Sequence, residues 1–96
     1  MIEYLIKPTK SEWFDFPEGS TPYRTIRTPF TSVEGWGNGR IEVEGCEISF
    51  SFEDPGIQVS FEGNMSQARA DEVIEEIKQA IEIAGNEPAE VIQISC

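Results

Sequence analysis

The clearest pattern in the chain is an alternation of apolar and polar residues in its middle. Between Cys46 and Glu53 apolar residues take every second position, with Glu or Ser between them. The alternation returns in Ile57–Glu62, after a turn signal at Asp54-Pro55-Gly56. A period of two predicts antiparallel strands that bury one face of a sheet and expose the other to water.

Shorter segments predict further strands beside this pair. They are Ile2–Lys7, Tyr23–Thr28 (extended by or paired with Phe30–Val33), Ile41–Glu44 and Glu90–Ser95. Asn38-Gly39 is the kind of dipeptide that closes a two-residue hairpin. Gly45 interrupts the pattern and predicts a turn or a bulge.

A helical period replaces the alternation after Gly63. Apolar residues recur three and four positions apart in one stripe: Ala70, Val73, Ile74, Ile77, Ala80, Ile81 and Ala84. Asn64 or Ser66 can cap the start of a helix, Gly85 fits its end, and Pro88 prevents continuation. These signals predict one helix over about residues 66–84.

The order of strands, one helix and a last strand predicts a single α+β domain over residues 1–96. We expect an antiparallel sheet of about five to six strands with the one main helix packed on one face. The final strand is expected at about residues 90–95. The apolar stripe of the helix and the apolar sheet face bury each other.

Charge adds a second feature, because it is unevenly distributed. Residues 1–40 carry five acids and five bases, whereas residues 41–96 carry thirteen acids and two bases, which accounts for the whole net charge of −11. Five acids fall at positions expected to face solvent on the sheet: Glu42, Glu44, Glu47, Glu53 and Glu62. No Lys or Arg lies between Ile41 and Ala68. Since like charges on neighbouring strands repel, this face favours a basic partner; the competing interpretation is solubility alone.

The predicted helix carries a second acidic surface. Its acids are Glu72, Glu75, Glu76 and Glu82, with Lys78 as the nearby base. Acidic solvated helix faces are common, so the sheet face is the stronger candidate. Glu82 opposes the helix dipole near the C-terminal end, which indicates some other use for this side chain.

The residue types exclude several kinds of chemistry. The chain has no histidine, which rules out Ser-His-Asp and Cys-His nucleophiles and histidine metal sites. In a reducing compartment Cys46 and Cys96 are expected as free thiols rather than as a disulfide. Their spacing also matches no zinc motif. The acids form rows rather than a convergent pocket. We therefore expect no enzyme, no metal and no cofactor.

Location and partners follow from the same composition. No apolar run approaches a membrane span, and the first residues do not resemble a secretory signal, so a cytoplasmic protein is expected. The charge of −11 would repel nucleic acid directly. Trp13 and Trp36 lie in irregular segments, where they either cover the core or anchor a protein partner. Self-association is left open.

Val59–Ser66, running into Ala70–Ile77, resembles small acidic bacterial immunity proteins of toxin–immunity systems. The resemblance is one of general type: short, acidic, α+β, with a strand followed by a helix. It implies an inhibitor that blocks a basic toxin or nuclease, and no functional residue is carried over. The alternative is a small regulatory or assembly module that binds through a sheet edge or an aromatic loop.

Overall fold

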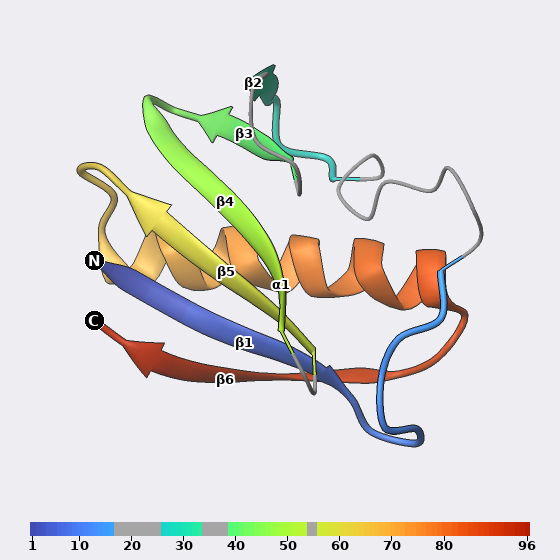
Figure 1. Cartoon of the computed structure of the whole chain (residues 1–96). Coiled ribbons are helices and arrows are strands. Elements are labelled where there is room, and N and C mark those ends of the chain that lie inside the picture. The colour runs from blue at the N-terminus through green and yellow to red at the C-terminus, as the bar shows by residue number, and fades with distance from the viewer. Residues whose placement is uncertain (17–25, 34–38, 54–55) are drawn as a thin grey trace.

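The computed structural model describes residues 1–16, 26–33, 39–53 and 56–96, with only the backbone given for Ser32, Val33, Phe52 and Glu53 (Figure 1). Within these ranges six strands form one sheet in the order β2-β3-β4-β5-β1-β6, and every neighbouring pair is antiparallel. The strands are β1 (Ile2–Pro8), β2 (Thr31–Val33), β3 (Arg40–Val43), β4 (Cys46–Glu53), β5 (Gly56–Glu62) and β6 (Ala89–Ser95). The helix is α1 (Gln67–Gly85). The predicted α+β class is confirmed.

The first strand lies inside the sheet. β1 pairs with β5 on one side and with β6 on the other. Because both are antiparallel to β1, β5 and β6 run in the same direction, and α1 connects them across the sheet (Figure 1). The result is a β5–α1–β6 unit with an antiparallel strand inserted between its two strands.

The core lies between α1 and the sheet face that it covers. The alternating apolar residues point into it, including Ile48, Val59 and Phe61, which are at most 2% exposed. On the helix the predicted stripe is buried at Ala70, Val73, Ile74, Ile77, Ala80 and Ile81. Phe14, Phe16, Phe30 and Met65 pack against this core from outside the regular elements.

The helix ends differ in part from the sequence prediction. Ser66 caps the N-terminus by accepting a hydrogen bond from the Arg69 N–H at 3.1 Å, which selects it over Asn64. At the other end Gly85 is the last helical residue, and Asn86 is the cap, with a left-handed backbone (φ 53°). The prediction of Gly85 as the cap was wrong because asparagine also tolerates this conformation.

The early part of the sheet also differs from the prediction. Residues 23–25 of the candidate strand Tyr23–Thr28 lie outside the described residues, and Ile26–Thr28 are not in a strand. The second strand is Thr31–Val33, within the segment proposed to extend or pair with it. Val33 pairs with Arg40, so residues 34–39 connect β2 to β3, a longer connection than the two-residue hairpin predicted at Asn38-Gly39.

Candidate functional site: the acidic row on the open sheet face

Three carboxylates lie side by side on three neighbouring strands. Glu42 of β3 pairs with Glu47 of β4, and Glu47 pairs with Glu62 of β5. Directly opposite residues share one face of a sheet, with Cβ atoms about 4.5–5.5 Å apart. Glu42 and Glu62 are exposed, and the side chain of Glu47 is 37% exposed. We call Glu42, Glu47 and Glu62 the acidic row.

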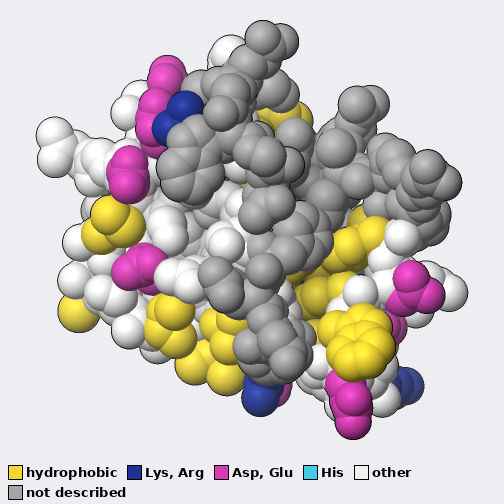
Figure 2. All heavy atoms as spheres, in the orientation of Figure 1, with side chains coloured by type: hydrophobic (Ala, Val, Ile, Leu, Met, Phe, Trp, Pro, Cys, Tyr) yellow, Lys and Arg dark blue, Asp and Glu magenta, His cyan; other side chains and the backbone are white. Residues whose placement is uncertain are grey.

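The acidic row faces away from the helix. Ile41, Val43 and Cys46, which alternate with these acids, are buried in the core to which α1 also contributes. We call the opposite side of the sheet, which α1 does not cover, the open face. In Figure 1 the sheet lies in front of α1, so Figure 2, in the same orientation, displays the open face. Acidic side chains gather at its upper left, over β3 to β5, and hydrophobic ones along its lower margin.

One base compensates the row in part. Arg40 stands two residues before Glu42 and so lies on the same face, where its guanidinium contacts the Glu47 carboxylate at 3.3 Å. The expectation of a sheet face without compensating cations is therefore corrected at Glu47. Within the described part of the chain, no Lys or Arg pairs with Glu42 or Glu62. Those two carboxylates are the members of the row that are open to an outside cation.

Glu44 does not belong to the open face. It forms a tight β3–β4 turn with Gly45, in which both residues have positive φ (52° and 81°). The turn carries the Glu44 carboxylate to α1, where it accepts from the Arg69 Nε at 3.0 Å. This hydrogen bond holds the pKa of Glu44 below its usual value. The sequence prediction placed Glu44 with the other acids by continuing the strand alternation to this residue. That placement is wrong, because alternation does not continue through a turn.

Glu3 extends the polar surface, and sequence reasoning missed it. It stands on β1 opposite Ser60, and its carboxylate accepts hydrogen bonds from Gln58 Nε2 at 2.6 Å and Ser60 Oγ at 3.0 Å. Its alternation with Ile2 and Tyr4 was visible in the sequence. What was missing was the strand order, which places β1 beside β5.

Cys46 lies directly behind the row, on the buried face. Burial raises the pKa of its thiol, and the nearby carboxylates of Glu47 and Glu62 raise it further. The thiol is therefore protonated at neutral pH and is a poor nucleophile. Cys46 and Cys96 are both free, as the sequence predicted.

The predicted aromatic anchors do not join the acidic row. Trp13 is 63% exposed, but it follows β1, whereas the row lies beside the beginning of that strand. The neighbouring Ser11 hydroxyl donates to Glu87, beyond the C-terminal end of α1. Trp36 and the side chain of Glu53 lie outside the described residues.

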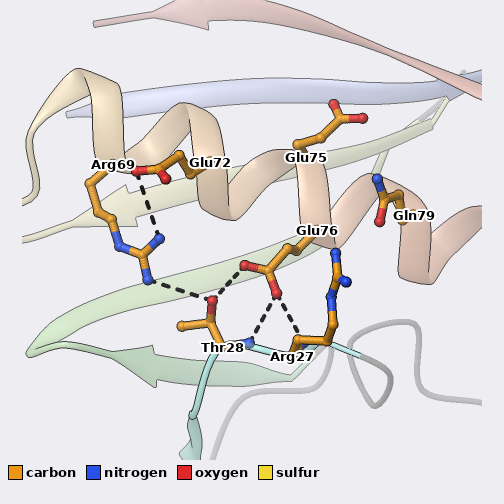
Figure 3. A pocket seen from close by; sticks show the side chains of 7 residues that line it. All are labelled: Arg27, Thr28, Arg69, Glu72, Glu75, Glu76 and Gln79. Atoms are coloured by element: carbon orange, nitrogen blue, oxygen red, sulfur yellow. Dashed lines mark hydrogen bonds and ion pairs between the residues drawn. The ribbon is translucent and has the colours of Figure 1, made fainter.

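The helix acids have partners within the chain. Glu76 accepts hydrogen bonds from the backbone N–H groups of Arg27 at 3.0 Å and Thr28 at 2.9 Å, and from the Thr28 hydroxyl (Figure 3). These bonds hold the pKa of Glu76 below its usual value. Glu82 accepts from the Ala89 N–H at 2.9 Å, which is the other use that its position on the helix indicated. Glu75 contacts Lys78 at 3.2 Å, and Glu72 lies 3.9 Å from Arg69.

Figure 3 shows a groove of about 460 Å³ between the helix and the segment before β2. It is lined by Glu72, Glu75 and Glu76 together with Arg27, Thr28, Arg69 and Gln79. Of its carboxylates, Glu76 accepts hydrogen bonds from the Arg27–Thr28 segment, whereas Glu72 and Glu75 lie near Arg69 and Lys78. By comparison, Glu42 and Glu62 on the open face have no ion pair with a Lys or Arg of the described residues.

Comparisons with known proteins add no assignment. No protein-family model, curated protein or solved structure matches this chain. In the described ranges, no cluster of three or more His, Cys, Asp or Glu side chains is placed to hold a metal ion. Nor does the helix described here have the length and apolar character to cross a membrane.

Proposed function

We propose that this chain is a non-catalytic binding protein whose open sheet face binds a basic partner protein. The observation that carries the proposal is the acidic row, in which Glu42 and Glu62 flank Glu47 and neither pairs with a Lys or Arg of the described residues. Keeping like charges adjacent costs a few tenths of a kcal/mol per pair, which a basic partner would reverse. Fields of opposite sign would also speed encounter with that partner.

The most specific form of the proposal is an inhibitor of the immunity type, which covers a toxin or nuclease with an acidic surface. It rests on the acidic row and on the resemblance to small acidic immunity proteins. A cytoplasmic location and the absence of catalysis belong to this proposal and stay predictions.

The test compares two variants with equal charge changes. Glu42→Gln/Glu62→Gln neutralises the open face, and Glu72→Gln/Glu75→Gln neutralises two exposed helix acids as the matched control. The immobilised wild-type chain and the control variant should retain the same basic protein from an extract of the source cells. The open-face variant should bind that protein at least tenfold more weakly, about 1.4 kcal/mol.

Two outcomes would contradict the proposal. One is equal retention by all three proteins. The other is an affinity that does not fall between low and high salt, since exposed charges are screened. Loss of folding would not imitate the effect, because removing like charges should leave the open-face variant at least as stable as wild type in a urea titration.

A second candidate is binding through the aromatic segment after β1, which the exposure of Trp13 favours. An apolar contact of this kind would resist salt. Trp13→Ala would then abolish capture, whereas Glu42→Gln/Glu62→Gln would leave it intact.

A further inference from the structure

The sheet has an apolar edge at β6. β6 is the last strand in the sheet order, and its outer residues Ile92 and Ile94 are 40% and 49% exposed. Natural proteins protect long edge strands with lysine, proline or bulges. β6 contains no lysine and no proline, and its bulge lies near one end, at Ile94.

Hydrogen bonding identifies which backbone groups of β6 point outward. The Thr9 N–H donates to the Pro88 carbonyl at 3.2 Å, in line with the β1–β6 ladder. Because antiparallel pairs alternate, residues 90 and 92 then bond β1, and residues 89, 91 and 93 point away from it. Two further observations support this assignment. The Ala89 N–H donates to Glu82 and not to β1. Its cross-strand partner is Pro8, which has no N–H to donate.

Side chains close both ends of this edge. Glu82 occupies the N–H of Ala89 at 2.9 Å. At the other end the bulge shifts the register, and Gln93 Nε2 donates to the Ser95 carbonyl at 3.2 Å. Between them, the outward backbone groups of Val91 and Gln93 have no partner among the described residues.

We propose that β6 pairs antiparallel with β6 of a second copy of this chain, about a two-fold axis at Ile92. In this register Val91 forms backbone hydrogen bonds with Gln93 of the partner subunit, and the reverse holds by symmetry. Ile92 then faces Ile92 of the partner subunit in a non-hydrogen-bonded pair, in which side chains approach most closely. The two sheets become one continuous sheet.

The positions of the hydrogen-bond donors and of the charges on β6 favour a two-fold axis at Ile92. An axis at Val91 would require the Ala89 N–H, which Glu82 already holds. Glu90, the one charge on β6, lies 3.2 Å from Lys7 and, with the axis at Ile92, is opposite Ile94 of the partner subunit rather than its own counterpart. The pairing therefore places the exposed Ile92 against Ile92 of the partner subunit and brings no two carboxylates together.

The negative charge of the chain makes this dimer depend on salt. The acidic row lies two to four strands from β6, roughly 10–19 Å at the usual strand spacing. Repulsion between two chains of charge −11 then acts at long range and is screened by salt. Salt should strengthen self-association, whereas it should weaken binding of a basic partner. The inference is independent of the proposed function.

Disulfide trapping tests the register. In a Cys96→Ser background, Ile92→Cys places two thiols in a facing pair about 4.5 Å apart at Cα, within the range of a disulfide. We expect rapid formation of a covalent dimer on mild oxidation. The matched control Glu90→Cys, two residues away on the same face, should cross-link at least tenfold more slowly. Equal cross-linking by both variants, or none by Ile92→Cys, would overturn the proposal.

Sedimentation velocity tests the dimer itself in the unmodified chain. Its dimer fraction should rise with protein concentration and from low to high salt, and Ile92→Lys should remain monomeric. A wild-type chain that is monomeric throughout would overturn the proposal. The two proposals fail separately: Ile92→Lys should still bind the basic partner, and Glu42→Gln/Glu62→Gln should still dimerise.

Discussion

At the scale of single residues, Glu76 fastens a loop to the helix. Its carboxylate accepts from the backbone of Arg27 and Thr28, beside Ile26, which is buried in the core. We expect Glu76→Gln to cost about 1 kcal/mol in the free energy of unfolding, measured in urea, because charge-assisted hydrogen bonds are weakened. Glu75→Gln, whose contact is the surface pair with Lys78, should change stability much less. Equal costs would show that Glu76 does not have this role.

The Glu76 carboxylate should also make the free energy of unfolding depend on pH in the acidic range. The pKa of Glu76 is lower in the folded chain than in the unfolded one. Its contribution is therefore fully present above about pH 4.5 and is lost as the pH falls through the folded pKa. The loss of stability as the pH falls below about 4.5 should be smaller in Glu76→Gln than in wild type, as urea titrations at several pH values would show.

Tyr4 gives the opposite dependence at high pH. Burial, followed by a 2.8 Å hydrogen bond to Asp71, raises the pKa of its hydroxyl to about 12. A raised pKa contributes stability below the unfolded value near 10, and this stability is lost as the pH rises through about 12. A spectrophotometric titration should contain a tyrosinate component near pH 12 that Tyr4→Phe removes. Its persistence in that variant would contradict the assignment.

Residue-scale contacts were the least predictable from sequence. The stretch without Lys or Arg is bounded by Arg40 and Arg69. Both side chains form ion pairs with acids inside this stretch, Arg40 with Glu47 and Arg69 with Glu44. Spacing along the chain gave no sign of either pair. Arg69 meets Glu44 through the packing of α1 against the β3–β4 turn, which is a tertiary contact.

At the scale of elements, the two glycines on either side of β4, Gly45 and Gly56, are required for different reasons. A Cβ on Gly56 would collide with the backbone of β1, lying 2.9 Å from the Lys7 Cα. Gly45 has open space around it and is constrained by its φ of 81° alone. We expect Gly56→Ala to cost about 3 kcal/mol from overpacking and Gly45→Ala about 1 kcal/mol from backbone strain, as urea titration would show. The reverse order would contradict the close approach of β5 to β1.

The helix cap offers a matched pair of positions. Ser66→Ala should cost about 1 kcal/mol, because it removes the acceptor for the Arg69 N–H. Asn64→Ala, two residues earlier and exposed, should be close to neutral. A larger loss at Asn64 would mean that the helix begins earlier than Gln67.

Elements with a strong period could be read from sequence alone. The alternation of β4 and β5 and the stripe of α1 each repeat over several residues, so local chemistry determines them. β2 has three residues, too few for a pattern, and it is a strand because β3 pairs with it. The helix cap at Asn86 was missed because it depends on one backbone angle.

At the scale of the whole molecule, the strand order could not be derived from the sequence. The acidic row depends on this order, since Glu42, Glu47 and Glu62 become neighbours only when β3, β4 and β5 pair in register. Alternation predicted the face of Glu42, Glu47 and Glu62 correctly. It failed at Glu44, in the turn, and it did not bring Glu3 to the same surface.

The central position of β1 has a consequence for the speed of folding. Ile6 pairs with Ile57 and with Val91, so the middle of the sheet closes only when distant parts of the chain meet. Bringing such parts together costs chain entropy before any contact forms, which slows folding. The β3–β4–β5 hairpins have no such delay. In stopped-flow kinetics, Gly45→Ala should therefore mainly slow folding, whereas Val91→Ala in β6 should mainly speed unfolding.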